Sequence, residues 1–142
     1  MTEIRTELSK KNDYYINKYR YLELKYFCLQ YPSWKRIYYS LDGLSRSPDY
    51  ISLLKVTEHG DPTAKCAEAK MIFTKKMDLV EKAAEEVDPI MSDYILLGVT
   101  ENLTYDKIKA RLNIPCCRGE YYKLYRKFFF TLHNSQNIQL LI

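Results

Sequence analysis

A basic segment near the C-terminal end carries the side chains of this sequence that are best suited to a function, which is contact with nucleic acid. Arginine and lysine neutralise phosphates and bind guanine edges, and glutamate accepts hydrogen bonds from cytosine amino groups. The segment presents such side chains on the face opposite an apolar stripe: Arg118, Glu120, Tyr122, Lys123, Arg126 and Lys127. This pattern predicts a helix that enters the major groove of double-stranded DNA.

A short helix is predicted just before this segment, over residues 105–111. Thr104 is its candidate N-cap, and residues 112–116 form a turn before the longer helix at about 118–132. Apolar positions are Ile108 and Leu112 in the first helix and Tyr121, Leu124, Tyr125, Phe128 and Leu132 in the second. This order predicts a helix-turn-helix, whose first helix lies over the DNA backbone. Three cations would then contact phosphates: Lys107, Lys109 and Arg111.

The distribution of charge is consistent with one polyanion-binding end. The chain has a net charge of +4, but residues 104–142 hold seven lysines and arginines against two acidic residues. Residues 61–103 hold five against nine. A solvated helix with spare lysines gives the same pattern, so charge supports DNA binding without deciding it.

Enzymes and metal proteins find no support in the sequence. It has no Gly-rich phosphate loop, no nucleophile elbow and no histidine beside a pair of carboxylates. The cysteines lack the short paired spacing of a zinc site: Cys28, Cys66, Cys116 and Cys117. The adjacent thiols at a helix start leave a redox sensor as a minor alternative to a structural role. We expect no catalysis, no metal, no cofactor and no small-molecule substrate.

Membrane and secretion signals are also lacking. No apolar run approaches the roughly 20 residues that span a bilayer, and the first residues carry mixed charge. We therefore expect a cytoplasmic protein that does not enter a membrane.

The N-terminal region, residues 1–60, is predicted to hold two helices followed by a loop. The first, at about 13–31, has an apolar stripe and ends at Pro32. That stripe comprises Tyr15, Tyr19, Leu22, Tyr26 and Leu29. The second, at about 33–42, has Ser33 as N-cap and closes at Gly43. Its predicted inward residues are Trp34, Ile37, Tyr38 and Leu41. Within residues 44–60, the segment 51–57 favours either a short strand or a helical turn.

The central region, residues 61–103, is divided by two Asp-Pro pairs that mark helix starts. Asp61-Pro62 begins a helix that ends near Val87, and Asp88-Pro89 begins the next. That next helix carries Ile90, Tyr94, Leu97 and Val99. The expected fold is therefore all-α, with the helix-turn-helix in residues 104–142. We expect helix 13–31 to pack on helix 63–87, and a homodimer is as plausible as a monomer.

Three stretches of this sequence resemble a known family. They are residues 114–122 continued by 125–129, residues 19–32 with Trp34 and Lys35, and Asp88-Pro89 followed by residues 94–96 and 99–100. Together they resemble small phage-encoded late-gene regulators of the RinA and ArpU type, found in prophages of Gram-positive bacteria. The chain departs from the family pattern at Cys117, usually glycine, and at Gly119, usually acidic.

The resemblance implies a sigma-region-4-like helix-turn-helix behind an N-terminal helical region. It implies a transcriptional activator of phage late genes that binds promoter DNA with host RNA polymerase. The alternative is a phage-encoded inhibitor that binds a host nucleic-acid enzyme through its helical or acidic surface. That surface would include Asp78, Glu81, Glu85, Glu86, Asp88, Asp93 and Glu101, which could imitate a line of phosphates.

Overall fold

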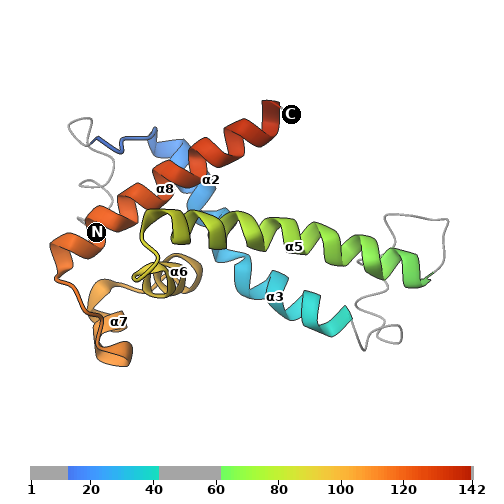
Figure 1. The fold of residues 1–142 in the computed structure, drawn as a ribbon, viewed down its shortest axis with the longest axis horizontal. Helices are drawn as coiled ribbons and strands as arrows, with labels where there is room; N and C mark the ends of the chain where they lie inside the picture. Colours follow the sequence, from blue (N-terminus) through green and yellow to red (C-terminus); the bar gives the residue numbers. More distant parts are fainter. Residues whose placement is uncertain (1–12, 42–61, 142) are drawn as a thin grey trace. The chain divides into compact units, whose positions relative to one another are not determined.

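The computed structural model describes residues 13–41 and 62–141, and it confirms the all-α class. These residues form helices and contain no strand (Figure 1). The helices are α2 (Lys18–Leu29), α3 (Tyr31–Ser40), α5 (Pro62–Val87), α6 (Ser92–Glu101), α7 (Tyr105–Leu112) and α8 (Arg118–Leu141). The predicted Gly43 helix end and the segment 44–60 lie outside the described residues. Among the helices described, none combines the length and apolarity needed to span a bilayer.

The described residues form two units of packing. One comprises residues 13–30 and 79–141, and the other comprises residues 31–41 and 62–78. The first unit thus brings α2 together with α6, α7 and α8, which come from the other end of the sequence. The sequence-based divisions after residues 60 and 103 follow helix punctuation and do not coincide with this grouping.

The buried face of α2 differs from the predicted stripe. Tyr21, Leu24 and Cys28 are buried, whereas Tyr19 is 76% exposed and Tyr26 is 61% exposed. The other stripe residues, Tyr15, Leu22 and Leu29, are half-buried. Aromatic and aliphatic residues lie on every side of this helix, so spacing alone does not select one face. The helix is also shorter than the predicted 13–31, because Asn17 caps it with a side-chain bond to the Tyr19 N–H.

The partners of α2 also differ from the prediction. This helix packs mainly on α6 and α8, whereas the sequence predicts residues 63–87 as its partner. The Tyr21 ring meets Phe129 edge-on with centroids 5.0 Å apart. The Tyr21 hydroxyl is hydrogen-bonded to the Tyr125 hydroxyl at 3.0 Å. The N-terminal helix therefore stabilises the basic C-terminal helix.

In the second unit, α3 begins earlier than predicted. Pro32 lies in its first turn, where a missing N–H costs nothing, so Ser33 is inside the helix and is not its N-cap. Trp34 and Leu41 are buried as predicted, while Ile37 and Tyr38 are half-buried. The Nζ atom of Lys76 lies 5.7 Å from the centre of the Trp34 ring.

The two Asp-Pro pairs behave differently. The helix predicted from Asp61-Pro62 to Val87 is confirmed as α5, which begins at Pro62. After Asp88, a turn comes first and α6 begins only at Ser92. The Oδ1 atom of Asp88 accepts hydrogen bonds from the N–H groups of Ile90 and Met91, at 2.9 and 3.2 Å. Ile90 is consequently 81% exposed and not on an apolar helix face.

The buried face of α6 is also shifted from the prediction. Val99 is buried as predicted, whereas Tyr94 and Leu97 are half-buried. The other buried residues of α6 are Ile95, Gly98 and Thr100.

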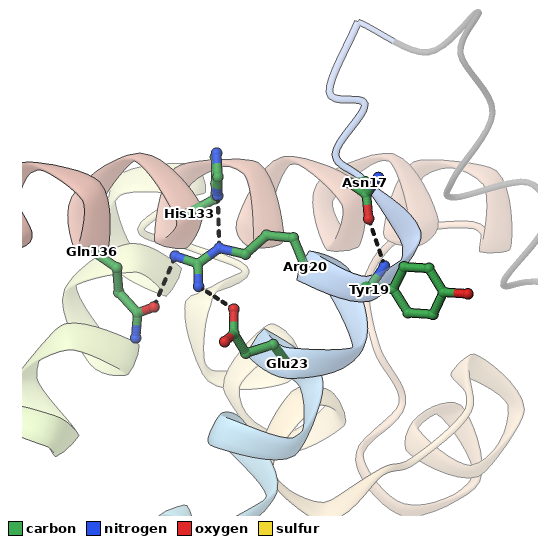
Figure 2. A network of polar contacts seen from close by, with 6 residues as sticks. All are labelled: Asn17, Tyr19, Arg20, Glu23, His133 and Gln136. Carbon is green, nitrogen blue, oxygen red and sulfur yellow. Dashed lines mark hydrogen bonds and ion pairs between the residues drawn. The ribbon is translucent and has the colours of Figure 1, made fainter.

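A polar cluster joins α2 to α8 (Figure 2). Arg20 donates from Nε to the Nδ1 atom of His133 at 2.9 Å and from Nη2 to the Oε1 atom of Gln136 at 3.0 Å. Its Nη1 atom pairs with Glu23 on the next turn of α2. Because Nδ1 of His133 accepts a hydrogen bond, this nitrogen carries no proton, and the imidazole is neutral.

We expect protonation of His133 to weaken the fold. Partial burial, and then the nearby charge of Arg20, hold the pKa of His133 below its ordinary value of 6.5. The unfolded chain therefore binds the proton more readily, so this stability is present above about pH 6.5 and is lost as the pH falls through the folded pKa. Urea unfolding at about pH 7.5 and about pH 5.5 should show lower stability at the acidic pH.

The His133→Asn variant is the matched control, because its side-chain oxygen can accept the Arg20 bond and does not titrate. Its loss of stability between the two pH values should be smaller than that of the wild type. Equal losses would show that His133 does not contribute to the acid sensitivity.

Candidate nucleic-acid interface

The first helix of the candidate interface, α7, is defined by a cap at each end. The Thr104 hydroxyl accepts a hydrogen bond from the Lys107 N–H at 3.3 Å, which confirms the predicted N-cap. Asn113 ends the helix in the left-handed conformation, with φ of 52°, and donates its N–H to the Lys109 carbonyl at 3.0 Å. Asparagine tolerates this conformation better than most residues. These caps determine where the turn before α8 begins.

Tyrosines fix the geometry of this turn. The Tyr105 hydroxyl donates to the Cys116 carbonyl at 2.5 Å, and the Tyr105 N–H donates to the Tyr122 hydroxyl at 3.2 Å. The Tyr121 N–H donates to the Cys117 carbonyl at 3.0 Å, and this bond closes the first turn of α8. Tyr122 is therefore half-buried and bonded to α7, although the sequence places it on the outward face.

A buried layer beneath α7 and α8 holds the two helices on α6. Ile108, Ile114 and Tyr121 are buried there. Gly98 of α6 lies so close to Tyr121 that a Cβ on Gly98 would be 2.0 Å from the tyrosine hydroxyl. Glycine is required at this position because the two helices could not otherwise approach each other this closely.

Most residues of the predicted apolar face of α8 are buried. Tyr121, Tyr125, Phe128 and Leu132 are buried, Leu124 is half-buried, and Phe129 joins the core. In α7, Ile108 is buried but Leu112 is 49% exposed. The helix α8 continues to Leu141, well beyond the predicted end at 132.

The predicted contact residues divide into an exposed and a half-buried group. The exposed residues are Lys107, Lys109, Arg111, Arg118, Glu120 and Lys123. The half-buried residues are Tyr122, Arg126 and Lys127. The Nε atom of Arg126 is buried and makes no hydrogen bond within the described part of the chain. The exposed cations thus come from α7 and from the first two turns of α8, and the following turn, with Arg126 and Lys127, offers less accessible charge.

An ion pair connects the beginnings of these two helices. Arg118, the first residue of α8, donates from Nη2 to the Oδ1 atom of Asp106 at 2.6 Å. Both side chains are exposed, at 63% for Arg118 and 67% for Asp106. Helical spacing relates neighbours three or four residues apart, so it gives no sign of a pair separated by 12 residues across a turn. The sequence pattern therefore gives no reason to place Asp106 in the candidate site.

The two thiols border an open hollow of about 580 Å³ at the turn, together with Lys109 and Arg118. Burial, with smaller contributions from Cys117, Glu120 and Asp88, raises the pKa of the Cys116 thiol. A raised pKa disfavours the reactive thiolate, which argues against an activated redox sensor at Cys116. Among the described residues, no group of three or more histidine, cysteine or acidic residues is arranged to hold a metal ion.

Comparison with known proteins finds no matching family model, curated protein or solved structure. The resemblance to phage late-gene regulators therefore remains a prediction from the sequence.

Proposed function

We propose that the chain is a sequence-specific DNA-binding activator of phage late genes that acts with host RNA polymerase in the bacterial cytoplasm. The observation that carries the proposal is the arrangement of α7, the turn and α8. The capped helix α7 packs on α8 through the buried rings of Tyr105 and Tyr121. Exposed cations lie along α7 and near the beginning of α8. This is the chemistry that a helix-turn-helix needs for contact with double-stranded DNA.

The two helices have different roles in this proposal. Lys107, Lys109 and Arg111 of α7 contact phosphates, which positions the protein but carries no sequence information. Arg118 and Glu120 lie in the first turn of α8, the part of a recognition helix that reaches base edges. Lys123 is exposed one turn later and supplies a further phosphate contact.

Binding to a short duplex of random sequence tests the proposal through its salt dependence. About four phosphate contacts should lower the affinity by about 10²-fold between about 50 and 200 mM salt. A variant with both Lys109→Ala and Arg111→Ala should bind more weakly and show a salt slope reduced by about two contacts. Fluorescence anisotropy of a labelled duplex measures both quantities.

The matched control removes two exposed lysines from α5, with Lys75→Ala and Lys82→Ala. This variant has the same net charge as the first, so it should keep nearly the wild-type slope if α7 contacts the DNA. Equal weakening by both double variants would indicate a non-specific effect of net charge. Failure of the wild type to bind at low salt would contradict the proposal. Retention of a host nucleic-acid enzyme on the immobilised protein after nuclease treatment would then support the inhibitor alternative.

A further inference from the structure

The ion pair between Asp106 and Arg118 has no evident role in holding the fold. Exposed ion pairs contribute little to stability because water and salt screen them. The α7–α8 junction is already held by the hydrogen bonds of Tyr105 and by the buried side chains of Ile108 and Tyr121. Because the fold does not depend on this ion pair, the pair can have a role in binding at the surface on which it lies.

The geometry of the pair leaves most of the arginine available. A guanidinium has five N–H donors in a rigid plane, and the bond to Asp106 uses one donor, on Nη2. Guanine offers two acceptors, O6 and N7, that match a pair of guanidinium donors. An arginine already held on one side loses less side-chain freedom when it forms this contact.

Although Asp106 favours the guanine contact of Arg118, its negative charge should weaken sequence-independent binding to DNA. Asp106 is an exposed carboxylate in the first turn of α7, the helix that we assign to the phosphate backbone, so it repels DNA of any sequence. The aspartate should thus weaken sequence-independent binding while it improves discrimination between bases.

We propose that Asp106 is a positioning residue that orients the guanidinium of Arg118 to bind guanine, so that the pair sets part of the DNA sequence preference. This inference rests on the proposed function and assigns a base class to the same site. Asp106 itself does not contact the base.

The test enriches duplexes from a random-sequence library with the wild type and with variants, and sequences the bound fraction. Asp106→Ala removes both the negative charge and the acceptor of the Arg118 bond. It should raise the affinity for the unselected library a few-fold, because one repulsive charge is gone. At one position of the preferred site, the same variant should lose about tenfold of the preference for guanine. A merely structural role would not raise general affinity while lowering preference at a single position.

Two further variants identify Arg118 as the residue through which Asp106 acts. Arg118→Lys keeps the charge but lacks the planar fork, so it should lose the preference at the same position. Combined with Asp106→Ala, it should lose no more than it does alone. Asp93→Asn removes an equivalent exposed first-turn carboxylate from α6 and should leave the preference unchanged. Thermal unfolding of each variant verifies that it is folded.

The outcomes separate this inference from the proposed function. A wild type that binds no duplex at low salt contradicts both. A wild type that binds and selects sequences, with an unchanged guanine preference in Asp106→Ala, contradicts only the role of Asp106. Additive losses in the double variant would likewise show that Asp106 does not act through Arg118.

Discussion

Replacing Gly98 with alanine is expected to destabilise the protein by about 3 kcal/mol, the upper part of the range for overpacked cores. The added Cβ would lie 2.0 Å from the Tyr121 hydroxyl and 3.1 Å from the Cδ1 atom of Ile108. Tyr121 is fully buried, with rings of Tyr105 and Tyr125 beside it at centroid distances of 5.9 and 6.2 Å. It has little room to move away, so α6 and α8 must separate. Urea unfolding measures the loss.

Two variants make this prediction specific. Gly119→Ala is the matched control, because a Cβ there meets no atom within 4 Å and alanine favours helix by up to about 1 kcal/mol. It should therefore stabilise the protein. Tyr121→Phe removes the oxygen nearest to the added Cβ, so Gly98→Ala should cost less in that background than in the wild type. Equal costs in both backgrounds would show that contact with the hydroxyl is not the cause.

Replacing Leu24 with alanine should cost about 3 kcal/mol of folding free energy, which is typical of a fully buried leucine. Leu22→Ala, two residues earlier on the same helix, should cost distinctly less because Leu22 is only half-buried. Chemical denaturation of the two variants compares the same substitution on two faces of α2. A larger loss for Leu22 would favour the face predicted from the sequence over the face that packs on α6 and α8.

The sequence predicts helices well where the chain carries explicit start and stop chemistry. Thr104 before α7 and Asp61-Pro62 before α5 identify their helix starts correctly, because capping depends on local backbone groups. Asp88 also bonds to following N–H groups, but it closes a turn and leaves α6 to begin four residues later. A local signal thus identifies a break between two helices more reliably than it identifies the first residue of the next helix.

The face of α2 could not be predicted in the same way. Its sequence offers tyrosine, leucine and phenylalanine on all sides, and the choice of Leu24 over Leu22 depends on what α6 and α8 present to it. In contrast, α8 carries lysine and arginine between its apolar residues, and its buried face was predicted almost completely. Contrast between faces, rather than total hydrophobicity, makes periodicity informative.

The candidate site shows the same limit in its polar contacts. Exposure of Lys107, Lys109 and Arg118 follows from helical spacing, whereas the partner of Arg118 depends on the geometry of the turn. Arg126 differs from the prediction because it is half-buried and its Nε atom is buried, which helical spacing does not reveal.

The aromatic residues of the two packing units make them spectroscopically distinct. Trp34, the only tryptophan of the chain, is buried in the unit formed by residues 31–41 and 62–78. The other unit contains the tyrosine cluster around Tyr121, whose close ring contacts should give a strong near-ultraviolet circular dichroism signal. Tryptophan emission therefore follows only the unit of Trp34, whereas tyrosine dichroism also follows the unit of Tyr121, although Tyr31, Tyr38 and Tyr39 of the Trp34 unit contribute to it. Coincident unfolding curves from the two signals would indicate one cooperative transition, and separated curves would give each unit its own stability.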